Sequence, residues 1–99
     1  MSAVRTSKQD FLVTKAQNFR KFINQYEPST TVKEYMEGFS EDQLIPTIAS
    51  KIMPLISLGV VDESAQKLLD ELHVPEDKKD EVKAKIIAYI NMFATVLME

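Results

Sequence analysis

The sequence predicts an all-α fold, a compact bundle of about five helices joined by short loops, and three observations support it. Only Gly38 and Gly59 are glycines among the 99 residues, fewer than the hairpin turns of a sheet need. Apolar residues recur three and four positions apart, the spacing of one helix face. Polar and apolar residues do not alternate over long stretches. We therefore expect residues 1–99 to form a single helical domain, with residues 1–6 flexible.

The first helix is predicted over residues 7–26. Thr6 or Ser7 can cap it, Asp10 suits its first turn because the helix dipole favours negative charge there, and Pro28 ends it. A short second helix, capped by a hydroxyl from residues 29–31, follows at once. Gly38 is predicted to end it in the left-handed backbone conformation that often follows a helix.

The third helix is predicted to run to about residue 58. Residues 40–43, Ser-Glu-Asp-Gln, match a capping box, in which the first side chain accepts from the fourth residue's N–H and the fourth reaches back. Pro46 lies in the first turns, where a missing N–H costs little. Pro54 lies in the interior and should kink or split the helix. Gly59 closes it.

Two further helices complete the predicted bundle. Asp62 is expected to cap a helix over residues 63–73, and Pro75 to open a last helix that runs to about residue 98. In residues 86–98 only Asn91 and Thr95 are polar. Because a helix that is apolar all round is normally buried, we expect the C-terminal helix to be long and largely buried.

The sequence offers few groups for catalysis or for cofactor and metal binding. It has no cysteine and one histidine, His73, at a predicted helix end. Two glycines cannot form a phosphate-binding loop. The acidic residues between 76 and 81 alternate with lysines and are typical of a solvated helix start. We therefore predict a non-enzymatic protein without cofactor or metal, in a cytoplasmic or otherwise intracellular setting, since secreted domains of this size usually carry disulfides.

The leading functional hypothesis is a protein-interaction or assembly module that associates with another copy of itself. The excess of apolar residues on the C-terminal helix supports it, because one face of that helix would be left for a partner. The predicted partner interface comprises Ile86, Tyr89, Ile90, Phe93, Val96 and Leu97. A small regulator or inhibitor that binds a different protein is the first alternative.

The charge distribution supports a second alternative, a nucleic-acid contact. The net charge is −3, but residues 1–26 hold five basic groups and one acidic group, whereas the remainder holds seven basic and fourteen acidic groups. The candidate anion contacts are Lys8, Lys15, Arg20 and Lys21. The acidic remainder disfavours a polyanion, so this basic helix could instead pair with the acidic region 62–81, within one molecule or between copies.

A third alternative is a bundle that binds an apolar ligand. Seven aromatic residues would line its pocket: Phe11, Phe19, Phe22, Tyr35, Phe39, Tyr89 and Phe93. Aromatic side chains of this kind more often fill a core. No stretch has the roughly 20 uninterrupted apolar residues of a membrane span, and we expect no membrane partner.

Overall fold

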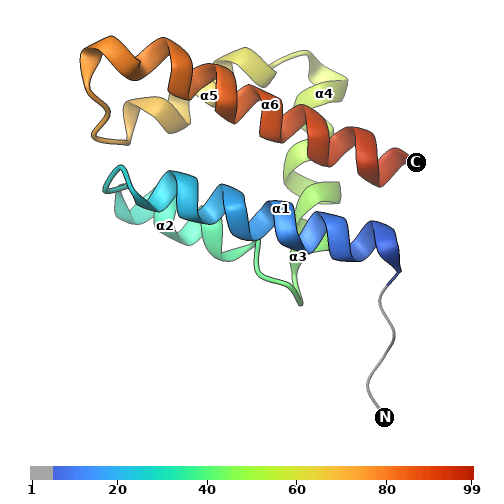
Figure 1. The fold of residues 1–99 in the computed structure, drawn as a ribbon. Coiled ribbons are helices and arrows are strands. Elements are labelled where there is room, and N and C mark those ends of the chain that lie inside the picture. Colours follow the sequence, from blue (N-terminus) through green and yellow to red (C-terminus); the bar gives the residue numbers. More distant parts are fainter. Residues whose placement is uncertain (1–5) are drawn as a thin grey trace.

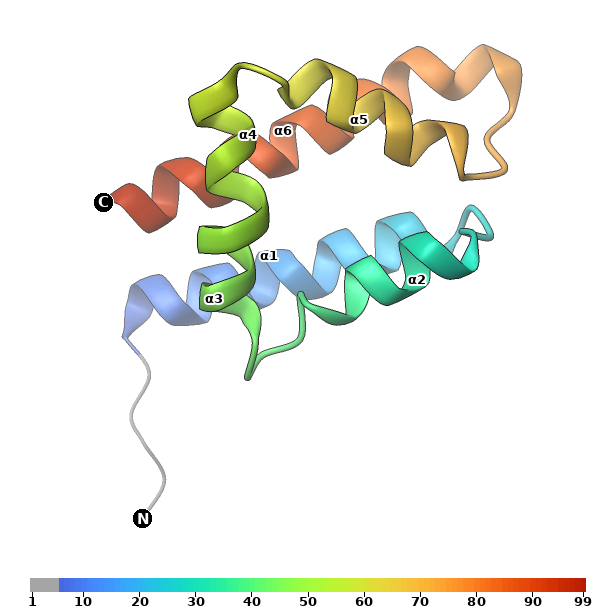
Figure 2. The ribbon, with the colours of Figure 1, turned by 180° about the vertical axis from the view of Figure 1, so that it is seen from behind.

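The computed structural model describes residues 6–99, which are 79% helical and contain no strand. The expected flexibility of residues 1–6 concerns mainly residues 1–5, which lie outside the described residues. Two helix pairs form two layers: α1 and α2 in one, α5 and α6 in the other. The run from α3 to α4 crosses between them at one end (Figures 1 and 2). The predicted all-α bundle is confirmed, with five helical segments when α3–α4 counts as one.

The first layer begins as predicted. Helix α1 spans Ser7–Asn24 and is capped by Thr6, whose hydroxyl accepts from the Gln9 N–H while the Gln9 side chain accepts from the Thr6 N–H. Helix α2 spans Thr30–Glu37 and is capped by Ser29, whose hydroxyl accepts from the Val32 N–H. These caps satisfy N–H groups that have no partner within the helix.

Two predictions about the link between α2 and α3 are wrong. Gly38 has a φ of −65°, so it is not left-handed. A glycine is needed there because a Cβ atom would lie 2.8 Å from Oγ1 of the buried Thr47. Residues 40–43 form turns, not a capping box, and the Ser40 hydroxyl donates to Asp42 Oδ1. The Gln43 N–H, which a capping box would direct to the Ser40 hydroxyl, donates instead to the Ser40 carbonyl at 3.1 Å.

The crossing run contains three consecutive segments: α3 (Leu44–Thr47), the π-helical turn η1 (Ile48–Ile52) and α4 (Met53–Leu58). In a regular α-helix the ring of Pro54 would collide with the Ser50 carbonyl. The wider π-turn immediately before it, closed by a bond from the Met53 N–H to the Ile48 carbonyl, accommodates the ring. The predicted interruption at Pro54 is therefore confirmed. Gly59 ends α4 in the left-handed conformation, with a φ of +68°.

The second layer is a helical hairpin with shifted boundaries. Helix α5 spans Val61–Asp70 and its N-cap is Val60, so the predicted cap at Asp62 is wrong. Asp62 Oδ2 instead accepts from Lys83 Nζ at 3.1 Å, which ties α5 to α6. Pro75 precedes a 3₁₀ turn, η2 (Glu76–Lys78), and α6 spans Lys79–Met98.

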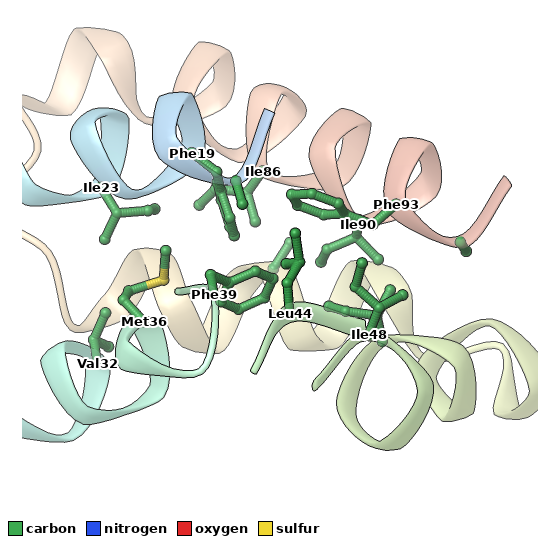
Figure 3. Close-up of a cluster of buried hydrophobic side chains, with 14 of the residues drawn as sticks. Phe19, Ile23, Val32, Met36, Phe39, Leu44, Ile48, Ile86, Ile90 and Phe93 are labelled. Carbon is green, nitrogen blue, oxygen red and sulfur yellow. The ribbon is translucent and has the colours of Figure 1, made fainter. Parts of the chain in front are cut away.

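The core lies between the two layers and is rich in aromatic rings (Figure 3). The Phe19 ring lies 5.3 Å from the Phe39 ring and 5.9 Å from the Phe93 ring, measured between centroids. These three side chains come from α1, the α2–α3 link and α6, and each is at most 1% exposed. One ring cluster therefore joins both layers.

In the part of the chain that the structure describes, no single helix has the length and hydropathy to cross a membrane. The run Leu44–Leu58 and α5 reach that length and hydropathy only as a pair, bent by 120°.

Candidate functional site

The structure separates the predicted partner interface on α6 into two groups. Ile86, Ile90 and Phe93 are 0%, 1% and 0% exposed and pack in the core. They face inward because this stripe of the helix lies against α1 and the π-turn η1, from which Phe19 and Ile48 point toward it (Figure 3). These three residues cannot contact a partner of the folded chain.

Tyr89, Val96 and Leu97, the other predicted interface residues, are half-buried at the edges of α6, as is Met92. The exposed stripe between these edges is mostly small or polar: Ala84, Ala88, Asn91, Thr95 and Met98. Helix α6 is therefore partly buried, and its solvent side is a smooth surface flanked by apolar side chains.

Helices α1 and α6 run antiparallel and lie on the side facing the viewer in Figure 1. Lys8 Nζ donates to the Leu97 carbonyl at 3.0 Å. Carbonyls in the last turn of a helix have no partner within it, and the negative end of the helix dipole attracts a cation. Lys8, a predicted anion contact, is thus engaged by the end of α6.

Three adjoining hollows lie along the solvent side of the contact between α1 and α6. One, of about 240 Å³, is lined by Lys15, Lys85, Ala88, Tyr89 and Met92. The next, of about 430 Å³, shares Lys85 and Tyr89 and adds Asn18, Lys21, Phe22 and Gln25. A third, of about 210 Å³, extends from Phe22 and Lys85 to Lys78 and Glu81. We call the residues of the first two hollows the α1/α6 face.

This face combines cations with aromatic rings. Lys85 Nζ lies 4.8 Å from the Phe22 ring centroid, and Lys15 Nζ lies 5.3 Å from that of Phe11, which is 43% exposed. Cation–π attraction holds each ammonium group over apolar surface without neutralising its charge. Burial raises the pKa of Tyr89 above its usual value.

The two regions predicted separately from the sequence therefore meet. Lys15 and Lys21, from the predicted anion contact, share the face with Tyr89, from the predicted interface. Arg20 is half-buried and lines neither hollow. Sequence reasoning missed Lys85 and Ala88, although residues 85, 88, 89 and 92 have the spacing of one helix face.

The aromatic residues proposed to line a ligand pocket mostly pack on one another. Ring contacts connect Phe19, Phe22, Tyr35, Phe39, Tyr89 and Phe93 in one continuous set. Phe22 and Tyr89 also line the hollows between α1 and α6, and Tyr35 lines a groove on the other side of the molecule. Phe19, Phe39 and Phe93 are core, as aromatic side chains usually are, and the half-buried rings of Phe22, Tyr35 and Tyr89 pack at its edge.

Groups for metal or acid–base chemistry are dispersed over residues 6–99. These residues contain no cluster of three or more side chains able to hold a metal ion. The backbone N–H of His73 donates to the Tyr26 carbonyl at 2.8 Å, and its side chain is exposed. His73 therefore has a structural role in joining the two interhelical loops.

No protein-family model, curated protein or solved structure matches this chain.

Proposed function

We propose that this chain is a non-enzymatic protein-interaction module that binds another copy of itself through the α1/α6 face. The observation that carries the proposal is the continuous surface in which Tyr89 and Met92 are flanked by Lys15, Lys21 and Lys85. Surfaces with partly exposed aromatic and methionine side chains are typical of protein contacts. Their methionines adapt readily to a partner's shape.

The surface on the second copy that suits this face is the acidic region of α5, η2 and the start of α6. Its exposed carboxylates belong to Asp62, Glu63, Asp70, Glu76, Asp77, Asp80 and Glu81. Opposite charges of this kind set the register of a contact and speed association more than they add affinity. Because the two surfaces differ, the contact is head-to-tail and forms a ring or an open chain of copies.

The test is the mass in solution, measured by light scattering behind a sizing column at several protein concentrations. The proposal predicts multiples of 11.3 kDa whose association weakens only modestly as salt is raised, since salt screens the charged contacts and not the apolar ones. Ala88→Glu should shift the protein to monomer, because it places a carboxylate in the centre of the basic face. Ala49→Glu is the matched control, since Ala49 is exposed on η1 and outside the face.

A monomer at every concentration would refute self-association and leave the face to a different protein, such as the target of a small regulator. Equal dissociation in the Ala88→Glu and Ala49→Glu variants would show that the added net charge causes the dissociation, and that the α1/α6 face is not the interface. Both variants add one negative charge at an exposed alanine, so their comparison isolates position.

Nucleic acid is the second candidate partner of the same face. Lys15, Lys21 and Lys85 lie around the rings of Phe22 and Tyr89. Proteins that bind single strands likewise combine cations that contact phosphates with rings that stack on bases. The net charge of −3 works against it. A salt-sensitive mobility shift with an oligonucleotide, lost in Lys21→Glu, would favour this function over self-association.

A further inference from the structure

A second concave site lies on the side of the molecule opposite to the α1/α6 face. It is a groove of about 420 Å³ between α2, the run η1–α4 and α5. These elements face the viewer in Figure 2. Neither the predicted interface nor the predicted anion contact includes its lining, apart from Ile90 on its floor.

The floor of the groove is apolar. The apolar residues that line the groove are Val32 from α2, Leu55 from α4, Leu68 from α5 and Ile90 from α6. Val32 and Ile90 are 2% and 1% exposed, so they form a packed base, while Leu55 and Leu68 are half-buried on its walls. Such a floor favours an apolar body because burial removes apolar surface from water.

Both ends of the groove are closed. At one end the η1–α4 segment crosses between the layers (Figure 2). At the other, Ser29 donates from its N–H to the Glu71 carbonyl at 3.1 Å and from its hydroxyl to Glu71 Oε1 at 2.7 Å. The His73 N–H, bonded to the Tyr26 carbonyl, reinforces this closure. The groove can therefore take a small molecule but not a helix that continues past either end.

Hydrogen-bond donors gather at the η1 end. Lys51 Nζ lies 5.3 Å from the centroid of the Tyr35 ring, and the Ser50 hydroxyl lines the groove beside them. Among the described residues the Tyr35 hydroxyl has no hydrogen-bond partner and Lys51 has no ion pair. Burial raises the pKa of Tyr35 to about 12. The protonated phenol can donate a hydrogen bond to a ligand oxygen.

The charges give the groove a direction. Glu71 lies at the closed loop end, where its carboxylate would repel an anion, and Lys51 lies at the opposite end. Lys67, which has no ion pair within residues 6–99, is on the α5 wall. An anionic group would therefore settle near Lys51 and Tyr35, with its apolar part extending toward Glu71.

We infer that the groove binds an amphipathic monocarboxylate. Lys51 and the Tyr35 hydroxyl hold its carboxylate, and its hydrocarbon chain lies against the apolar lining of Val32, Leu55, Leu68 and Ile90. A volume of about 420 Å³ is within the range of small-molecule sites, and dodecanoate serves as the test compound. This site does not depend on the proposed self-association, because none of its lining residues belongs to the α1/α6 face or to the acidic carboxylates named above.

The test is calorimetric titration of the full chain with dodecanoate and, separately, with dodecanol, each below the concentration at which it aggregates. Dodecanoate should bind one to one and at least about tenfold more tightly than dodecanol, since hydrogen bonds to a charged group are stronger than hydrogen bonds to a neutral hydroxyl. Tyr35→Phe and Lys51→Met should each weaken dodecanoate binding about tenfold and leave dodecanol binding nearly unchanged. Lys33→Met is the matched control, because Lys33 is exposed on α2 and does not line the groove.

Three results would overturn the inference. The first is no binding of dodecanoate at millimolar concentration to the wild-type chain. The second is equal affinity for dodecanoate and dodecanol, which would exclude the head-group contacts. The third is an equal loss in Lys33→Met, which would mean adsorption to surface lysines in general. Melting curves of Tyr35→Phe and Lys51→Met show that the variants are folded when affinity is compared.

Discussion

Gly38 shows how a single residue can be fixed by its surroundings and not by its own backbone. Its φ of −65° is available to any residue, yet a Cβ atom would lie 2.8 Å from Thr47 Oγ1 and 3.1 Å from Thr47 Cγ2. Thr47 is 7% exposed and β-branched, so its side chain has little freedom to move away. The contact between the end of α2 and α3 therefore depends on the missing side chain.

We expect Gly38→Ala to lower the free energy of unfolding by about 1–2 kcal/mol in urea denaturation. Overpacking costs about 1–3 kcal/mol, which exceeds the roughly 0.4–1 kcal/mol that alanine gains by restricting the unfolded chain. In a Thr47→Ala background both close atoms are gone, and the same Gly38→Ala change should become neutral or stabilising. An unchanged cost in that background would show that the Thr47 contact is not the cause.

Helix α2 has eight residues and depends on its cap. Ser29 both caps α2, through its bond from the Val32 N–H, and donates to Glu71 across the loops. The Thr6 hydroxyl caps α1 only: within residues 6–99 it bonds to the Gln9 N–H and to no other helix or loop. We expect Ser29→Ala to lower the free energy of unfolding by about 2 kcal/mol and Thr6→Ala by about 1 kcal/mol. Equal losses in the two variants would mean that the bond between Ser29 and Glu71 contributes nothing.

The helices that could be predicted from the sequence are those with local signals. Thr6, Ser29, Pro54 and Gly59 act on their own or adjacent turns, and each marks the boundary or interruption expected of it. The capping box predicted at Ser40 does not form. Residues 40–43 have the right residue types for it, but the chain turns at these residues instead of starting a helix. Only the position of α3, set by packing, decides between these two conformations.

The candidate site was predicted only in part, for a related reason. Residues 86–98 contain two apolar stripes, and the sequence does not say which one faces inward. The aromatic cluster of Phe19 and Phe39 selects the stripe of Ile86, Ile90 and Phe93 for the core. Tyr89 and Met92 remain at the surface, beside lysines of α1 that lie about 70 residues earlier in the chain. Such a juxtaposition exists only once two helices have packed.

At the scale of the whole molecule, two layers and one crossing segment explain both concave surfaces. The α1/α6 face forms where helices of different layers meet side by side. The groove forms where α2 and α5 are held apart by η1–α4 at one end and by the Ser29–Glu71 bonds at the other. Both surfaces therefore depend on the rings that hold the layers together.

Phe19 is the residue on which that cohesion can be tested. Its ring contacts Phe39, Tyr89 and Phe93, and it is 0% exposed, so Phe19→Ala leaves a cavity between the layers. We expect a loss of about 3–5 kcal/mol in the free energy of unfolding, a large part of the about 5–15 kcal/mol typical of a small domain.

Phe11→Ala provides the matched control, since Phe11 lies on the same helix and is 43% exposed under Lys15. Its loss removes partly solvated surface and one exposed cation–π contact, together about 1 kcal/mol. Urea denaturation of both variants measures the difference. If Phe19→Ala costs no more than Phe11→Ala, the layers are not joined through this ring. The α1/α6 face and the groove would then be expected to survive independently of the aromatic cluster.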